Sequence, residues 1–221
     1  MKNKKKLFAV LAAVLLIAIV GVGSTIAYLT DKEEIPNTLT VGHVDITLTE
    51  NQVEKDSTGK EYIQTTEITD KGLTFGEVLP GQTVPKNPTI TVTEDSADAY
   101  VRAKLEVTAP DGSKITEADL KVLEDALIAQ IKADDDWYYN ETDGYFYYQS
   151  VRKATETAVL FKTVTIPGEE WAANTAGQTF NIKVYAEAIQ ADYFTPATTE
   201  GKISGWLGST GEPIDVMGYN K

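Results

Sequence analysis

The chain has 221 residues, in which 20 Lys and Arg stand against 33 Asp and Glu, with one His and no Cys. The acidic balance excludes the phosphate-driven binding by which basic proteins hold nucleic acid. The lack of Cys excludes disulfides and thiolate metal sites, so a folded form must rely on its apolar core or on partners. A hydrophobic share of 42% is typical of a folded chain, and the length suits one sizeable domain.

The first 27 residues follow the order of a secretory signal peptide. Four lysines precede an unbroken apolar run, Leu7–Val20, after which small residues lead to Ala27. This order predicts cleavage between Ala27 and Tyr28 and places the mature chain outside the cell, in the extracellular matrix or at the cell surface. The apolar run has 14 residues, whereas a membrane-spanning helix needs about 20. An uncleaved anchor that continues through Leu29 is the alternative.

Alternation of apolar and polar residues with period two predicts most of the mature chain to be β-strand. The clearest strand covers residues 39–50, where a change of parity at Gly42-His43 indicates a bulge or bend. Further strands are predicted over residues 89–93, 100–107, 159–166 and 180–188. In the second of these, the alternation places three charged side chains on the outer face: Arg102, Lys104 and Glu106.

Two further signals punctuate this pattern. Leu79-Pro80-Gly81-Gln82 predicts a turn, because proline fixes φ at the first central position and glycine accepts a positive φ at the second. Residues 116–131 predict one amphipathic helix, which covers an open edge or end of the β core. Its apolar residues recur at helical spacing, and Thr116 with Asp119 forms a cap signature.

These elements together predict a mainly β, antiparallel fold. Seven to nine strands follow one another without regular helices between them, which favours a two-sheet sandwich of jelly-roll or Greek-key type. The sandwich domain is expected to cover residues 28–194, with an extended N-terminal arm at 28–39. Residues 195–221 are rich in Gly, Thr and Pro and are expected to form a loosely ordered tail.

The sequence offers little that could support catalysis. A zincin needs two histidines on one helix, and a Ser-His-Asp site would have to use the lone His43, which is predicted to face solvent on a strand. We therefore predict no enzyme activity and no cofactor. Asp134-Asp135-Asp136 with Glu141 and Asp143 leaves calcium as an alternative to a solvated acidic turn, although the spacing matches no 12-residue calcium loop.

Aromatic residues gather on both sides of the segment Asn140–Gly144. Trp137-Tyr138-Tyr139 precedes it and Tyr145-Phe146-Tyr147-Tyr148 follows it, which predicts an aromatic hairpin. Alternation sends about half of these rings into the core and half outward. The candidate contact surface, for sugars or for another subunit, consists of Trp137, Tyr139, Tyr145 and Tyr147.

The leader and first strand carry a resemblance to a known family. The segments 23–31 and 37–46 resemble the camelysin/TasA family of exported proteins, and the turn at 79–82 and the strand at 184–191 extend the likeness. The resemblance implies cleavage by a SipW-type signal peptidase, a jelly-roll domain and assembly into extracellular fibres of the biofilm matrix. It also implies that the freed N-terminal segment of one subunit adds as a strand to the next. Some relatives carry a metallopeptidase label, but this sequence has no zinc-ligand set to support it.

The residues of the arm give this implication a physical basis. Cleavage frees an extended segment in which charged residues are flanked by four apolar ones: Tyr28, Leu29, Ile35 and Leu39. Such a strand can satisfy the unpaired backbone groups on the exposed sheet edge of a neighbouring molecule. The contact is head-to-tail, so the product is an open homopolymer that touches the membrane only through its leader before cleavage.

Three classes of function stay open on this sequence. The first is a secreted structural protein that forms matrix fibres. The second is a cell-surface binding module, for carbohydrate or protein, that uses the aromatic hairpin. The third is a secreted metal-dependent hydrolase, which the residues favour least.

Overall fold

The fold comes from a computed structural model, and the residues that it describes belong to the unit Gly42–Lys221. The residues described are 43–50, 65–69, 72–75, 78–168, 171, 175, 178–192, 194–208 and 210–214. In these ranges the chain is mainly β, with antiparallel sheets and one α-helix. The predicted leader and the arm at 28–39 lie outside them.

The first sheet has the strand order β1-β5-β9 and is antiparallel throughout. Its strands are β1 (Ile46–Glu50), β5 (Pro88–Val92) and β9 (Thr157–Val159). The inward side chains Ile90, Val92 and Ala158 are buried, whereas the positions between them in β1 and β5 are threonines. Such β-branched residues favour a pleated surface with one wet face.

A short ladder lies next to this sheet in the sequence, since one of its strands precedes β5 and the other follows β9. There β4 (Thr83–Pro85) pairs with β10 (Thr163–Thr165), and Val84 and Val164 are buried opposite each other. The predicted strand at 159–166 is therefore two strands, because the chain leaves the ladder between Val159 and Thr163. Leu160 and Phe161 are buried in this interruption.

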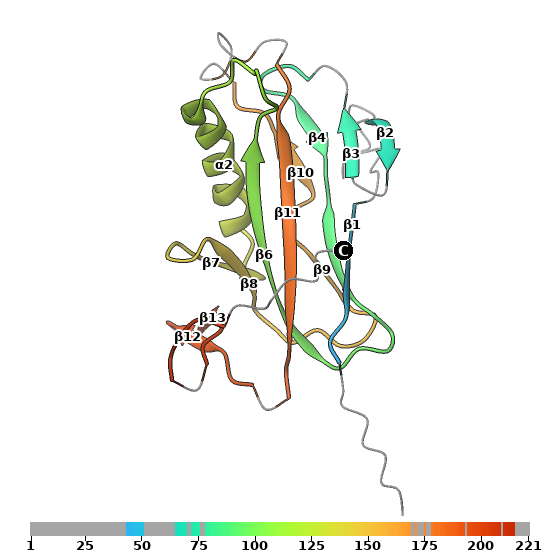
Figure 1. The fold of residues 1–221 in the computed structure, drawn as a ribbon, viewed down its shortest axis with the longest axis vertical. Helices are drawn as coiled ribbons and strands as arrows, with labels where there is room; N and C mark the ends of the chain where they lie inside the picture. The colour runs from blue at the N-terminus through green and yellow to red at the C-terminus, as the bar shows by residue number, and fades with distance from the viewer. Residues whose placement is uncertain are drawn as a thin grey trace, which may run out of the picture. The chain divides into compact units, whose positions relative to one another are not determined.

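The second sheet has the order β11-β6-β8-β7. Its strands are β11 (Asn181–Gln190), β6 (Ala99–Thr108), β8 (Tyr145–Tyr148) and β7 (Trp137–Asn140), all antiparallel. The two long strands β6 and β11 pair over their full length of ten residues. Figure 1 shows them side by side.

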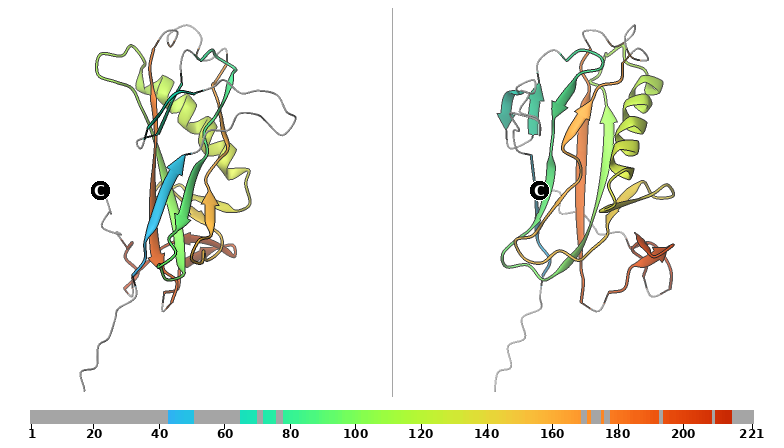
Figure 2. Two further views of the ribbon diagram at one scale, coloured as in Figure 1. Left: turned by 90° about the vertical axis from the view of Figure 1, so that its right-hand side faces the viewer. Right: turned by 180° about the vertical axis from the view of Figure 1, so that it is seen from behind.

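The helix α2 (Glu117–Lys132) begins at a capping box, as predicted. The Thr116 hydroxyl accepts a hydrogen bond from the Asp119 backbone, and the Asp119 carboxylate accepts one from the Thr116 backbone. Leu123, Leu127 and Ile131 are buried, and the helix contacts β6 and β7 on the side of β6 away from β11 (Figures 1 and 2). No helix in the described part of the chain is long and apolar enough to span a bilayer.

Both sheets and the helix contribute to one hydrophobic core. Its buried residues include Ile90 and Val92 from the first sheet, Val101 and Ala103 from the second and Leu127 from α2. The predicted turn at 79–82 is confirmed, since Gly81 has φ of 81° and the Gln82 N–H donates to the Leu79 carbonyl at 3.0 Å.

Two hairpins complete the described structure. The first joins β2 (Thr65–Thr69) to β3 (Gly72–Phe75). The second joins β12 (Ala197–Thr199) to β13 (Lys202–Gly205), which contacts β7 and β8. This second hairpin lies in the segment that the sequence predicts to be a loose tail. The segment is ordered there because Gln149 pairs both its amide groups with the Ile203 backbone, at 2.8 and 2.9 Å.

The capping box gives a first testable prediction. Replacing Thr116 with Ala leaves the Asp119 N–H without its acceptor, so we expect the free energy of unfolding to fall by about 1 kcal/mol. Urea denaturation measures this change. Thr116→Ser keeps the hydroxyl and should stay close to the native value, whereas equal loss in both variants would contradict the capping argument.

Candidate functional site

The free edge of β11 is the first candidate site. Along its ten residues β11 pairs with β6, and it ends its sheet in the strand order of the described residues. A strand in this position presents a row of N–H and C=O groups that can pair with another chain.

The register identifies the backbone groups at this edge. The Ala191 N–H donates to the Asp98 carbonyl at 2.8 Å, which makes these two residues a hydrogen-bonded pair at the end of the ladder. Hydrogen-bonded and non-hydrogen-bonded pairs alternate along an antiparallel ladder. Since the register is regular, the odd-numbered residues of β11 direct their backbone groups at β6. The residues that direct theirs at the free edge are therefore Ile182, Val184, Ala186, Ala188 and Gln190.

The inward side chains show that the hydrophobic core is less well buried at the same edge. On β6, Val101, Ala103 and Leu105 are at most 5% exposed. Their direct partners on β11 are Ala188, Ala186 and Val184, which are only partly buried although they pack against the same core. The apolar face of the sheet is thus covered at β6 and incompletely covered one strand further on.

The strand β1 shows the same feature in the first sheet. It lies at the end of the described sheet, and its Leu48 is 38% exposed although its partner Ile90 is 1% exposed. Because β1 and β11 are in contact, these two free edges adjoin each other. We call this strip the β1–β11 seam, and it consists of Ile46, Leu48, Ile182, Val184, Ala186 and Ala188.

The opposite margin of the core is closed. The Trp137 indole N–H on β7 donates to the Val159 carbonyl on β9 at 2.9 Å, which links the two sheets directly. The Gln130 amide on α2 donates to the Thr163 carbonyl on β10 at 2.7 Å, so the helix is also held to the β4–β10 ladder. This margin is therefore closed by direct links between the elements that border it.

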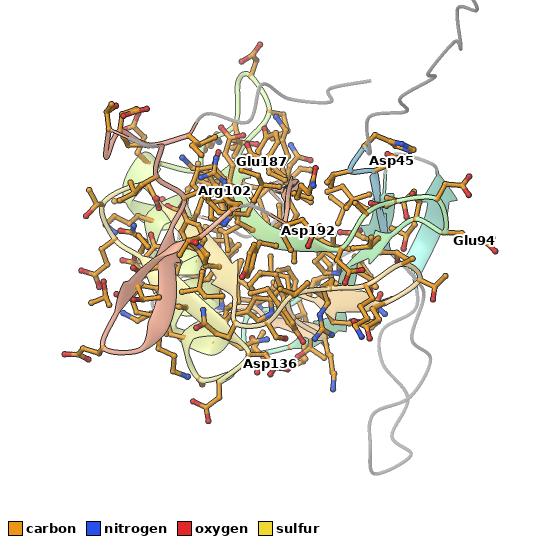
Figure 3. All side chains as sticks on the ribbon, turned by 90° about the horizontal axis from the view of Figure 1, so that it is seen from below. Asp45, Glu94, Arg102, Asp136, Glu187 and Asp192 are labelled. Atoms are coloured by element: carbon orange, nitrogen blue, oxygen red, sulfur yellow. The ribbon has the colours of Figure 1, made fainter. Side chains whose placement is uncertain are left out.

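A buried arginine forms the second cluster. Arg102 is expected to be exposed, but its residue is 4% exposed although it lies on the outer face of β6. Its Nε donates to Glu187 at 2.7 Å, and its guanidinium lies 4.0 Å from the Tyr145 ring centroid and 4.5 Å from that of Trp206. Figure 3 shows Arg102 and Glu187 side by side. Burial opposes the charged guanidinium, but hydrogen bonds to Tyr147 and Glu187 outweigh it, so the pKa of Arg102 is raised.

The C-terminal segment completes this cluster. Trp206 covers one face of the guanidinium, and the Ile214 carbonyl accepts a hydrogen bond from Arg102 at 3.2 Å. The Tyr147 hydroxyl donates to Asp143 at 2.7 Å, and burial is the largest cause that raises the pKa of Tyr147 to about 12. The alternation in residues 100–107 correctly gives the face of Arg102. It gives no information about the segment, about 100 residues away, that covers this face.

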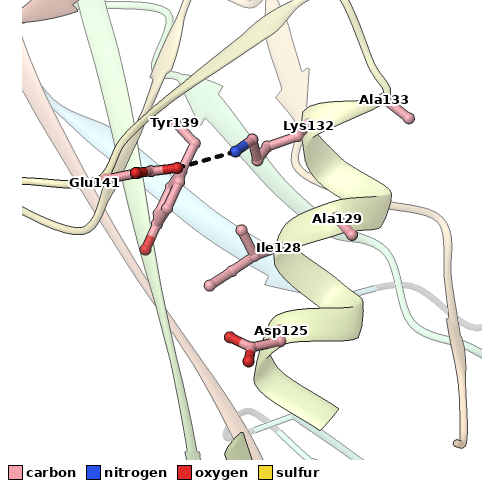
Figure 4. Close-up of a pocket in the computed structure, with 7 residues that line it drawn as sticks. All are labelled: Asp125, Ile128, Ala129, Lys132, Ala133, Tyr139 and Glu141. Atoms are coloured by element: carbon pink, nitrogen blue, oxygen red, sulfur yellow. Dashed lines mark hydrogen bonds and ion pairs between the residues drawn. The ribbon is translucent and has the colours of Figure 1, made fainter. Parts of the chain in front are cut away.

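The four residues of the predicted aromatic surface separate into two groups. Trp137 and Tyr147 are 4% and 1% exposed, which corrects the expectation that they form an outer contact surface. The first packs edge-on against Tyr148 and the second lies beneath Trp206. Tyr139 and Tyr145 are partly exposed, and the Tyr145 ring already lies against Arg102. Tyr139 lines a pocket, which Figure 4 shows.

The candidate metal and catalytic residues do not come together. The described residues contain no group of three or more His, Asp or Glu side chains that could hold a metal ion. In the acidic turn, the Asp134 carboxylate accepts a hydrogen bond from the Asp136 backbone N–H, and the Asp143 carboxylate accepts one from the Tyr147 hydroxyl. Both carboxylates are therefore already hydrogen-bonded within the protein. His43 is exposed, as predicted, but it precedes β1 and does not lie on a strand.

The predicted cleavage site and donor strand cannot be compared with the structure. Ala27, Tyr28, Leu29, Ile35 and Leu39 all lie outside the described residues. Their roles stay predictions.

Comparisons with known proteins add no assignment. No model of a protein family matches the chain, and no curated protein matches it.

The arginine cluster gives the second prediction. Arg102→Ala leaves the Glu187 carboxylate and the Tyr147 hydroxyl without their buried partner, so we expect the free energy of unfolding to fall by about 3–5 kcal/mol. We also expect faster protease cleavage within residues 206–214. Lys183→Ala, on the neighbouring strand and exposed, should change stability by less than about 0.5 kcal/mol. Equal urea midpoints for the two variants would contradict a stabilising role for Arg102.

Proposed function

We propose that this chain is a secreted structural protein that assembles head-to-tail into extracellular matrix fibres. In this proposal the two larger sheets are the faces of a jelly-roll or Greek-key sandwich, and residues 28–39 of one subunit pair with the free edge of β11 in the next. The observation that carries the proposal is the β1–β11 seam, where two strands at the ends of their described sheets carry partly exposed core side chains. The resemblance of the N-terminal segments to the camelysin/TasA family supports the same function.

The dimensions of the two partners are compatible. A strand rises about 3.3 Å per residue, so the twelve residues of the arm extend over about 40 Å and the ten of β11 over about 33 Å. The arm can therefore cover the whole free edge.

The chemistry of the two partners is also complementary. Backbone pairing would satisfy the edge-directed groups of Ile182 through Gln190. Apolar side chains of the arm would lie over the seam, where burial contributes roughly 25 cal/mol per Å² of apolar surface removed from water. Because donor and acceptor are different parts of the subunit, each addition leaves one of each free and a filament grows.

Deletion of the arm gives the third prediction. The chain that starts at Tyr28 should form filaments in electron microscopy, whereas the chain without residues 28–39 should stay monomeric in light scattering with the same unfolding midpoint. A version that keeps the leader residues in front of Tyr28 should assemble more slowly, because its strand is not free. Filaments from the chain without residues 28–39 would overturn the donor role.

A proline at the free edge gives the fourth prediction. Ala186→Pro removes an N–H that is directed at the edge but not at β6, and edge strands tolerate such a change. We expect this variant to donate its arm but not to accept one. Ala186→Ser keeps the N–H and should form filaments normally.

Mixing the two defective proteins makes the test specific. Ala186→Pro carries only a donor and the chain without residues 28–39 carries only an acceptor, so an equimolar mixture should yield dimers and nothing longer. Filament growth by Ala186→Pro alone would exclude β11 as the acceptor.

A further inference from the structure

A shallow pocket lies between α2 and β7, at the opposite edge of the second sheet from β11. Its volume is about 650 Å³, and it is open to solvent. Figure 4 shows the Tyr139 ring facing the helix, with Ile128 opposite it. The helix contributes residues at helical spacing and the hairpin contributes two more; the lining is Asp125, Ile128, Ala129, Lys132, Ala133, Tyr139 and Glu141.

The floor of this pocket is apolar and aromatic. Ile128, Ala129 and Ala133 present aliphatic surface, and Tyr139 presents a ring supported by Phe146, with a centroid distance of 4.7 Å. Tyr139 is one of the predicted aromatic contact residues that the arginine cluster does not use. A rigid ring beside aliphatic side chains is a surface that binds another flat, partly apolar group.

The rim carries hydrogen-bonding groups of both kinds. Lys132 Nζ lies 3.2 Å from Glu141 Oε1 and 5.8 Å from the centroid of the Tyr139 ring. Asp125 pairs with Lys121 at 2.7 Å on the same helix. Burial, Glu124 and Glu141 raise the pKa of Tyr139. A phenol keeps its proton at neutral pH even without this shift, so the hydroxyl can donate. The rim therefore offers carboxylate acceptors next to ammonium and phenol donors, with the opposite charges paired.

The charge of the chain disfavours anionic ligands. It has 33 Asp and Glu against 20 Lys and Arg, and Lys132, the lysine that lines the pocket, is already paired with Glu141. A neutral molecule with many hydroxyl groups satisfies the donors and acceptors together, and its C–H faces suit the apolar floor. Sugar units of a neutral polysaccharide have this chemistry.

We propose that the pocket between α2 and β7 binds a neutral saccharide chain, with Tyr139 as the stacking ring and Asp125, Lys132 and Glu141 as hydrogen-bonding partners. The site is separate from the β1–β11 seam, since β7 and β11 are opposite edges of one sheet. Binding does not depend on fibre formation, and subunits in a fibre would each present one such pocket.

The test is calorimetric titration of the chain that starts at Tyr28 with two neutral probes, cellohexaose and the hexamer of N-acetylglucosamine. We expect millimolar or tighter binding of at least one probe, and at least tenfold weaker binding by Tyr139→Ala and by the double variant Asp125→Asn/Glu141→Gln. Tyr185→Ala removes another exposed tyrosine, on β11, and should leave binding unchanged.

A further variant distinguishes loss of binding from loss of folding. Ala129 is exposed on α2, so Ala129→Arg fills the pocket without touching the Tyr139–Phe146 contact and should abolish binding while the unfolding midpoint stays unchanged. Absence of binding by the native chain at 10 mM of either probe would overturn the proposal, with 10 mM taken as roughly ten times the weakest expected Kd. Equal binding by native chain and Ala129→Arg, or binding of a hexalysine peptide at this pocket in place of both sugars, would also overturn it. Filament formation should be unaffected in every variant, so failure here is distinguishable from failure of the assembly proposal.

Discussion

The rest of this structure depends on the ladder between β6 and β11. Ten residue pairs hold the two strands in one register, and the same face of both strands points at the core. On β6 that face is covered by α2 and the first sheet, whereas on β11 it is covered only in part. Within the described residues, an edge strand with partly exposed apolar side chains is the feature on which the assembly proposal rests.

The outer face of the same ladder is covered by other parts of the chain. There the Arg102–Glu187 pair is enclosed by aromatic rings and by the C-terminal segment, which contributes Trp206 and the Ile214 carbonyl. A buried ion pair is costly to break once its surroundings exclude water. The C-terminal segment is thereby fixed to the outer face of the sheet, and it leaves the edge of β11 unpaired in the described structure.

The two proposals place different chemistry at opposite edges of the second sheet. The edge at β11 offers a backbone template and apolar side chains, which suit a β-strand. The edge at β7 is closed by α2 and offers an aromatic floor with paired charges, which suits a neutral polar ligand. A matrix protein with this division could form its polymer with one edge and contact a surrounding polysaccharide with the other.

Local patterns in the sequence were enough for several elements, because each depends on neighbouring residues alone. Thr116 and Asp119 determine the start of α2, Pro80-Gly81 determines the turn, and alternation determines the faces of β6 and β11. Alternation also gave the outward direction of Arg102, but only the tertiary structure decided that it is buried. The residues that cover it come from β8, β11 and positions 206–214, and period-two patterns contain no information about partners so far apart in sequence. The open seam and the pocket at Tyr139 were likewise decided only by the tertiary structure. Each depends on which strand lies at an edge of the sheet and on whether the helix covers that edge.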